Sequence, residues 1–101
     1  MVGIDIVQLS RVQLKDSFVH YVLTESEIEE YNNRPENSKK EYLAGRFACK
    51  EAIYKATQDK DFLKYSILTD NNGRPYVAGH EEMEVSISHD GDYAIAIVVI
   101  Y

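Results

Sequence analysis

The sequence predicts an α+β fold in which one long helix, accompanied by short helices, packs on an antiparallel sheet. Three observations support this class. The chain has 101 residues, a length that commonly forms a single domain, here residues 1–101. A strand-like segment opens the chain, and a long segment of helical periodicity occupies its middle. Strand-like segments separated by turn residues fill the rest, and this order of elements is typical of α+β proteins.

Two elements are expected before the long helix. Residues Val2–Leu9 are rich in β-branched side chains, which favour a strand. A short apolar stretch follows at Phe18–Leu23. Residues Thr24–Glu27 form a capping box, in which the first and last side chains cap the opening turn of a helix. This helix should end near Asn32, because Pro35 disfavours a helical conformation at the residue before it.

The main helix is predicted to begin at a second capping box, Ser38–Glu41, and to run to about Thr57. Its apolar residues recur at the spacing of an amphipathic helix and form one stripe. We expect this stripe to face the sheet; it contains Leu43, Ala44, Phe47, Ala48 and Tyr54.

Four strand segments are predicted after the helix: Tyr65–Thr69, Arg74–Val77, Glu84–Ser88 and Tyr93–Ile100. The first two are joined by Asn72-Gly73, which is a strong hairpin signal. The last two are joined by the tight turn Asp90-Gly91. The last segment is a continuous apolar run, a pattern that indicates burial on both faces of the sheet.

Composition excludes several classes of protein. The apolar share of 45% and the charged share of 28% are ordinary for a folded domain. The longest apolar run, Ala94–Tyr101, is far shorter than the roughly 20 residues of a membrane-spanning helix, so no membrane partner is expected. No basic segment precedes the apolar start of the chain, which argues against a signal peptide. A single cysteine, Cys49, cannot build a disulfide framework, which favours a cytoplasmic location.

The charge distribution points to an anionic partner other than nucleic acid. The net charge is −6, from 11 basic and 17 acidic residues, which argues against general nucleic-acid binding as the function. Residues 39–64 nevertheless hold seven Lys and Arg against four acidic residues, a local charge of +3 that leaves −9 on the rest. A local basic surface on an acidic protein indicates a specific acidic partner.

A carboxylate lies inside the apolar stripe of the main helix. Glu51 falls about 80° from Leu43 on a helical wheel, in the middle of the stripe. Because an unpaired buried carboxylate is costly, Glu51 needs a partner. Two interpretations stay open: an ion pair with Lys55, four residues further on, or a carboxylate held inward for a metal ion or a substrate.

Asp5 is a second unusual carboxylate, because aspartate is disfavoured in strands and Asp5 lies inside the first one. It points to the face opposite Ile4 and Ile6, which is also the face of Gly3. The absent side chain of Gly3 leaves room there for another backbone or a ligand. The strand therefore either has one half-exposed polar face or carries a functional carboxylate.

Two such carboxylates and a nearby lysine suit the binding of Mg²⁺ with a phosphate group. Mg²⁺ takes one or two protein carboxylates and completes its shell with water and phosphate oxygens. Asp5 and Glu51 are the candidate ligands, and Lys55 would neutralise the same phosphates. No Walker loop or G-x-G-x-x-G motif is present to hold a nucleotide.

Other polar residues have ordinary explanations when each is taken alone. Arg46 and Lys50 flank the stripe of the helix, where a solvated helix edge is the common case. His89 ends a strand, where a surface histidine is usual, and Cys49 points away from Glu51 as a small structural residue. No Ser/His/Asp or Cys/His set for nucleophilic catalysis is apparent.

Several segments, in this order, resemble a known family. They are GIDIV at 3–7 followed by Arg11, GRFACKEAIYKA at 45–56, NGRPY at 72–76 and VSISH at 85–89. Together they resemble holo-acyl-carrier-protein synthase, the small trimeric type of 4′-phosphopantetheinyl transferase. Each motif alone would be weak, but the resemblance covers nearly the whole chain.

The resemblance implies an activity and its partners. Such an enzyme moves 4′-phosphopantetheine from coenzyme A to a serine of apo-acyl carrier protein, with Mg²⁺, and releases adenosine 3′,5′-bisphosphate, in fatty acid biosynthesis. It implies a homotrimer with active sites between subunits. The alternative is a non-catalytic relative that binds acyl carrier protein or coenzyme A.

The resemblance also implies roles for six residues. It makes Asp5 and Glu51 the metal ligands, Glu51 and Lys55 the catalytic residues, Arg46, Lys55 and His89 the coenzyme A contacts, and Arg11 the contact to the acidic carrier protein. The chain departs from the family after the helix, where residues 57–62 lack the usual Gly-Thr-Gly loop. Lys60 is a candidate to take over a phosphate contact there.

Overall fold

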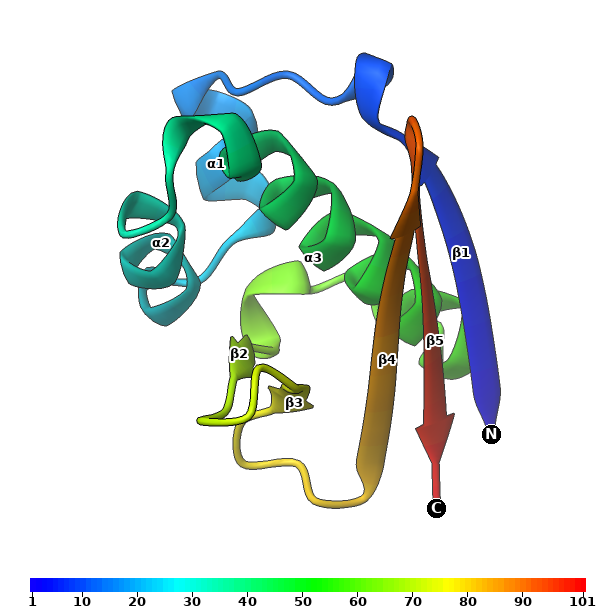
Figure 1. Ribbon diagram of the computed structural model, residues 1–101. Helices are drawn as coiled ribbons and strands as arrows, with labels where there is room; N and C mark the ends of the chain where they lie inside the picture. The colour runs from blue at the N-terminus through cyan, green and yellow to red at the C-terminus, as the bar shows by residue number, and fades with distance from the viewer.

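The computed structural model describes residues 1–101, and its main feature is a three-stranded antiparallel sheet crossed by one long helix (Figure 1). The strand order is β1-β5-β4, so the first strand pairs with the last. The elements are β1 (Val2–Gln8), β4 (Met83–Asp90), β5 (Tyr93–Ile100) and the crossing helix α3 (Glu36–Thr57). The predicted α+β class with an antiparallel sheet is confirmed.

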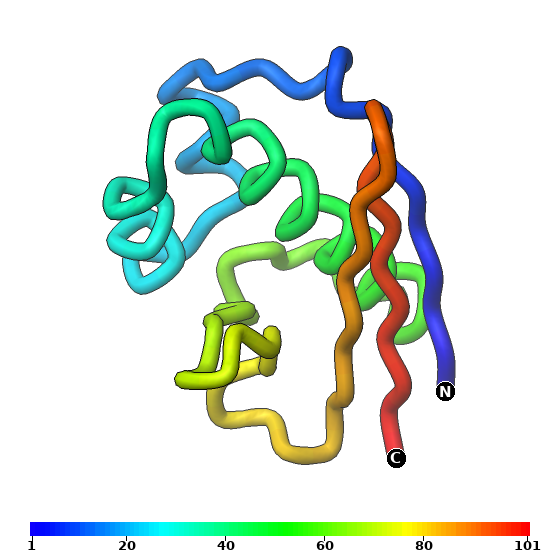
Figure 2. The backbone as a smooth tube through the Cα atoms, viewed as in Figure 1, coloured from blue at the N-terminus to red at the C-terminus, as the bar shows by residue number.

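Most of the smaller elements lie on the side of α3 away from the sheet (Figure 1). The smaller elements are the helices α1 (Asp16–Val22) and α2 (Glu25–Asn32), the 3₁₀ turns η1 (Leu9–Arg11) and η2 (Phe62–Lys64), and the hairpin strands β2 (Ile67–Thr69) and β3 (Pro75–Val77). Of these, β3 also packs beside β4, whereas η1 joins β1 to the helical side. The two chain ends lie side by side, where the Met1 ammonium donates to the Ile100 carbonyl at 2.7 Å (Figure 2).

Several local predictions are confirmed. The Thr24 hydroxyl accepts from the Glu27 backbone N–H, while the Glu27 carboxylate accepts from the Thr24 N–H at 2.8 Å, which completes the capping box of α2. Gly73 (φ 82°) turns the β2–β3 hairpin, and Gly91 (φ 58°) turns the chain from β4 into β5. Both glycines occupy the left-handed region that other residues rarely adopt.

One local prediction is wrong. Helix α3 begins at Glu36 rather than at a Ser38 capping box, and the Ser38 hydroxyl instead donates to the Pro35 carbonyl at 3.1 Å. The fixed φ of Pro35 already sets the direction of the chain into the helix, and Glu36 favours the positive end of the helix dipole. The apolar stretch Phe18–Leu23 forms most of α1.

The sheet has one buried face and one bare face. Gly3, Val7, Ala94, Ala96 and Val98 lie against α3 and are buried. The other face of β1 and β5 consists of apolar residues in facing pairs, Val2 with Val99, Ile4 with Ile97 and Ile6 with Ile95. Ile4 and Ile6 are 53% and 61% exposed. The expectation that β5 is buried on both faces is therefore wrong for this single chain.

Candidate functional site

A close approach between β1 and α3 sets the base of the candidate site. A Cβ built on Gly3 would lie 1.9 Å from the Ala52 carbonyl oxygen, so only glycine allows the strand to touch the helix backbone here. Asp5 lies two residues along the same face of β1, half-buried against α3. The predicted role of Gly3 in making room for another backbone is confirmed.

Lys55 of α3 binds the middle of β1, at Asp5. Its ammonium donates to the Asp5 carboxylate and to the Ile4 carbonyl, each at 3.0 Å. The lysine therefore pairs with Asp5 across the helix–strand contact, and not with Glu51 on its own helix. The side chain of Lys55 is 53% exposed, so its charge also faces solvent.

Glu51 lies one helical turn before Lys55 and is half-buried. Its pKa is raised, first because burial disfavours the charged carboxylate and second because the Asp5 charge lies nearby. The cations of Lys55 and Lys60 act in the opposite direction. Two neighbouring carboxylates repel each other, and a bound cation would reduce this repulsion.

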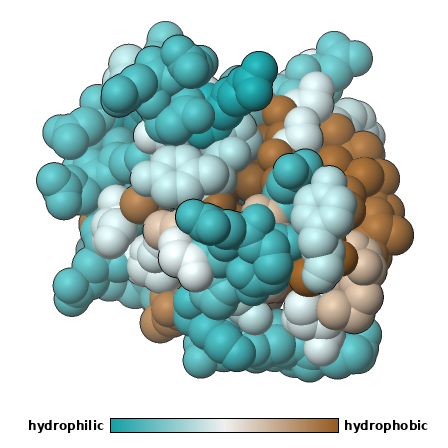
Figure 3. Space-filling model, turned by 90° about the horizontal axis from the view of Figure 1, so that it is seen from below, coloured by the Kyte–Doolittle hydropathy of each residue, from teal (hydrophilic) through white to brown (hydrophobic).

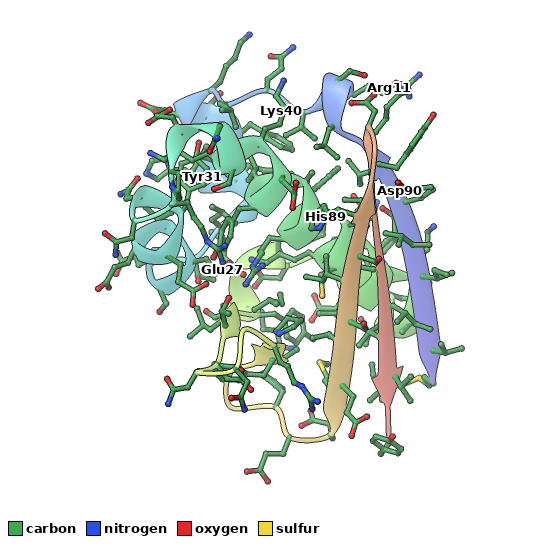
Figure 4. The ribbon with its side chains drawn as sticks, in the orientation of Figure 1. Arg11, Glu27, Tyr31, Lys40, His89 and Asp90 are labelled. Atoms are coloured by element: carbon green, nitrogen blue, oxygen red, sulfur yellow. The ribbon has the colours of Figure 1, made fainter.

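Asp5 and Glu51 open into a pocket of about 660 Å³ between the sheet, α3 and the segment that joins β1 to α1. Arg11 of η1 lines the same pocket (Figure 4). The remaining walls are mostly apolar and include Val7, Val12, Phe18, Phe47 and Tyr93. Three of the six residues singled out in the sequence thus share one cavity, with Lys55 bound to one of them.

Arg46 is not in this pocket. It is buried, and its guanidinium donates to the Ile67 carbonyl at 3.1 Å and to the Thr69 hydroxyl at 2.8 Å. It also meets the Glu30 carboxylate at 3.4 Å and lies 4.1 Å from the centre of the Tyr42 ring. In this chain Arg46 therefore ties α3 to α2 and β2, which corrects the interpretation of a solvated helix edge.

His89 belongs to β4 and packs against the first half of α3, away from the pocket of Asp5 and Glu51 (Figure 4). Its Nε2 is 3.1 Å from the Glu41 carbonyl, and its Nδ1 is 3.5 Å from the Glu41 carboxylate. A Cβ on Gly45 would lie 3.2 Å from the imidazole, so this glycine gives the ring its place on the helix. A second, shallow cavity contains His89 together with Ile6 and Tyr93.

Lys50 is a structural residue that the sequence interpretation missed. It is 1% exposed, and its ammonium is 2.5 Å from the carboxylate of Glu27, which is 0% exposed. The same ammonium donates to the Val22 carbonyl at 2.5 Å and to the Phe62 carbonyl at 3.0 Å. Burial lowers the pKa of Lys50, and the Glu27 charge partly offsets that effect. Placing Lys50 on a solvated helix edge was wrong.

Phe18 is a pocket wall that the sequence interpretation left without a role. Its ring lies 5.3 Å from that of Phe47 in an edge-on arrangement, and the pair forms one side of the cavity beside Glu51. The sequence offered one signal for this role. Phe18 belongs to an apolar stretch, and such a stretch could have been expected to pack against Phe47, which was already predicted to face inward.

The fold and this site define a class of protein that a family comparison identifies. The model of the 4′-phosphopantetheinyl transferase superfamily matches residues 1–98, and the chain belongs to that superfamily. No helix of the protein is both long enough and apolar enough to cross a membrane.

Curated relatives narrow the identification to one kind of transferase. The chain is 39% identical over 100 residues to the holo-[acyl-carrier-protein] synthase of Mycoplasma mycoides, covering 97% of this chain and 91% of that protein. It is 38% identical over 112 residues to the holo-[acyl-carrier-protein] synthase of Bacillus subtilis, and the match covers 98% of this chain and 93% of that protein. The predicted family and the predicted class of enzyme, a phosphopantetheinyl transferase, are confirmed.

Solved structures agree with the curated relatives. The synthase of Bacillus anthracis in complex with CoA (3′,5′-ADP) has a TM-score of 0.87 and 34% identity, covering 98% of this chain and 93% of that chain. The Helicobacter pylori synthase in complex with coenzyme A has a TM-score of 0.83 and 32% identity, covering 100% of both chains.

Proposed function

We propose that this protein transfers 4′-phosphopantetheine from coenzyme A to a serine of apo-acyl carrier protein, using Mg²⁺ and releasing adenosine 3′,5′-bisphosphate, in fatty acid biosynthesis. The observation that carries the proposal is that the carboxylates of Asp5 and Glu51, from different elements, line the same open pocket. The relatives support it, because they are holo-[acyl-carrier-protein] synthases and two of their structures contain coenzyme A or its nucleotide.

The two carboxylates fit a magnesium ion. They come from different elements, they lie close enough for the Asp5 charge to raise the pKa of Glu51, and they face a cavity that a phosphate group can enter. Carboxylates and phosphate oxygens are ligands that Mg²⁺ accepts. When bound, the ion would supply charge neutralisation to the phosphate oxygens. Asp5 and Glu51 are the residues that would hold it.

Lys55 and Glu51 are the proposed catalytic residues. Phosphoryl transfer depends mainly on positioning and on stabilising the charge of the phosphate oxygens. Lys55 already donates to the Asp5 carboxylate and to the Ile4 carbonyl, and the third donor of its exposed ammonium is left for a diphosphate. The hydroxyl proton of the attacking serine needs an acceptor, and the Glu51 carboxylate is the proposed one because it lines the pocket that a phosphate group can enter.

The acidic carrier protein is proposed to dock at Arg11. This arginine is exposed, lines the pocket that contains Asp5 and Glu51, and also lines a smaller cavity with Lys15. Two cations at the entrance of the site attract an acidic surface and orient it toward the pocket.

The protein is proposed to act as a homotrimer with active sites between subunits. The support is the bare face of β1 and β5, whose paired isoleucines would be costly to leave in water as a continuous patch. Figure 3 shows the apolar surface gathered on the sheet side of the molecule. A contact from His89 to coenzyme A would then come from a neighbouring copy, because His89 lies outside the Asp5 pocket. For Arg46, whose guanidinium is already bound to Glu30 and Thr69, that contact rests on the family resemblance alone.

Intact mass spectrometry of an apo-acyl carrier protein tests the proposed function. The carrier is incubated with this protein, coenzyme A and Mg²⁺. We expect a gain of one phosphopantetheine, its loss when EDTA removes the metal, and its loss in Glu51→Gln protein that is still folded. Bound coenzyme A without any transfer would support the non-catalytic alternative instead. The cytoplasmic location, inferred from the single cysteine, stays a prediction.

A further inference from the structure

The turn after α3 places a lysine at the end of the helix. Gln58 has a left-handed backbone (φ 65°), and its N–H donates to the Tyr54 carbonyl at 2.7 Å, which ends α3 and reverses the chain. It is the only residue other than glycine with a positive φ in the protein. Two residues later the chain carries Lys60.

Asp59 fixes this turn from both sides. Its backbone N–H donates to the Thr57 hydroxyl at 3.1 Å, and its carboxylate accepts from the Asp61 N–H at 3.0 Å and from the Lys64 ammonium at 2.9 Å. These contacts hold the backbone on each side of Lys60. The lysine therefore projects from a defined base and not from a loose loop.

The ammonium of Lys60 lies over the ring of Tyr54, 4.9 Å from its centre, and forms no ion pair. Its two cationic neighbours are occupied, since Lys55 binds Asp5 and Lys64 binds Asp59. Tyr54 follows Glu51 by three residues on α3, so both side chains lie on the same side of the helix. Lys60, held over Tyr54, therefore lies on the side of α3 that carries Glu51.

We infer that Lys60, seated on Tyr54, is a further substrate-binding residue that holds the diphosphate of coenzyme A beside Lys55. The inference rests on the proposed function and deepens it. A cation over an aromatic face keeps its outward N–H donors free, and an ammonium binds phosphate oxygens as a compact charge. Tyr54 is then a positioning residue that acts through Lys60.

The test compares Lys60→Gln with a matched control, Lys39→Gln. Lys39 also places its ammonium over a tyrosine, Tyr31, at 5.3 Å, but near the opposite end of α3. Both variants lose one positive charge and one cation–aromatic contact, and Lys39→Gln in addition loses the ion pair of Lys39 with Glu36 at 3.1 Å. We expect Lys60→Gln to raise the KM for coenzyme A about fivefold, the scale of one exposed charge contact. We expect kcat to change little, and Lys39→Gln to match the wild type.

A second substrate separates the diphosphate from the other phosphate of coenzyme A. Dephospho-coenzyme A keeps the diphosphate and lacks the 3′-phosphate, so the Lys60→Gln penalty should be the same with either substrate. A penalty that disappears with dephospho-coenzyme A would overturn the assignment to the diphosphate. The role of Tyr54 is tested by Tyr54→Phe, which keeps the ring and should behave as wild type, and by Tyr54→Leu, which should share the Lys60→Gln defect.

Calorimetry of coenzyme A binding tests the role of Lys60 without relying on turnover. If the wild type binds coenzyme A but transfers nothing, the proposed function fails while Lys60 is still tested by its binding constant. If the wild type transfers normally and Lys60→Gln binds as tightly as Lys39→Gln, the inference about Lys60 fails alone.

Discussion

Replacing Lys50 by methionine should destabilise the protein strongly, because it leaves a buried charge without a partner. The Lys50 ammonium makes three contacts, to Glu27, Val22 and Phe62, and neither Lys50 nor Glu27 reaches solvent. Methionine fills a similar volume but cannot donate. Breaking a buried ion pair from one side costs about 3–5 kcal/mol, and a domain of this size has only about 5–15 kcal/mol of stability.

Urea unfolding followed by circular dichroism gives the free energy of unfolding. Thermal unfolding gives a second measure. A loss of 1 kcal/mol lowers the melting temperature of a small domain by about 4–8 °C, so the melting temperature of Lys50→Met should fall by more than about 12 °C. The matched control is Lys64→Met, which breaks an ion pair of similar length, 2.9 Å, whose lysine is 53% exposed. That variant should stay close to the wild type, because solvent screens the exposed pair.

The double variant Glu27→Gln/Lys50→Met separates the charge from the packing. The glutamine carries no charge and keeps only one acceptor oxygen. In Glu27 the Thr24 N–H donates to Oε1 and the Ile67 N–H to Oε2, at 2.8 Å each, so the variant keeps one of these two hydrogen bonds and loses the other. We expect the double variant to regain about 1–3 kcal/mol over Lys50→Met, the usual size of such coupling. If Lys50→Met costs no more than Lys64→Met, or if the two changes are additive, the argument from an uncompensated buried charge is refuted.

Three further predictions follow from single contacts. Gly3→Ala should cost about 1–3 kcal/mol of stability, since its Cβ would lie 1.9 Å from the Ala52 oxygen, and should reduce transferase activity more than it reduces folding, because β1 carries Asp5; unchanged activity and stability would contradict the close approach. The Cys49 thiol should react with Ellman's reagent only after urea unfolding, because burial raises its pKa to about 12; rapid labelling of the native protein would be inconsistent with this. The Asp61 N–H and Lys64 hold the pKa of Asp59 below its ordinary 3.8, so its stabilising contribution is present above that value and is lost as the pH falls through the folded pKa. Unfolding curves of Asp59→Asn between pH 5 and pH 2 should therefore show a shallower loss of stability than the wild type, and an identical slope would count against the assignment.

The elements that were predictable from the sequence depend on interactions between close neighbours in the chain. The capping box at Thr24 needs only a side chain three residues away, and the Gly73 and Gly91 turns need only their own backbone freedom. The start of α3 failed because two local signals competed there. The proline at position 35 fixes the chain direction three residues before the serine that was expected to cap the helix.

The residues that were mispredicted depend on partners far away in the chain. Lys50 lies at the edge of the apolar stripe, and nothing near it reveals that its partner is Glu27, 23 residues earlier. Arg46 is similar, since the groups that it binds belong to α2 and β2. Asp5 and Glu51 were found because a carboxylate in an apolar pattern is conspicuous whatever its partner is.

The sheet leaves one apolar face uncovered, and the predicted site residues Asp5 and His89 lie in two separate cavities. A second copy of the chain would explain both observations. β5 is apolar on both faces and β1 adds Val2, Ile4 and Ile6 to one of them, but a single chain has only one layer of helices to cover the sheet. The uncovered face includes Ile6 and Tyr93, which line both the pocket of Asp5 and Glu51 and the shallow cavity of His89. A second copy packed on this face would bury the facing isoleucines and would add its own side chains to the edge of the Asp5 pocket. The same apolar pattern that misled the prediction about β5 therefore supports the proposed trimer, in which one copy supplies the carboxylates and its neighbour completes the site.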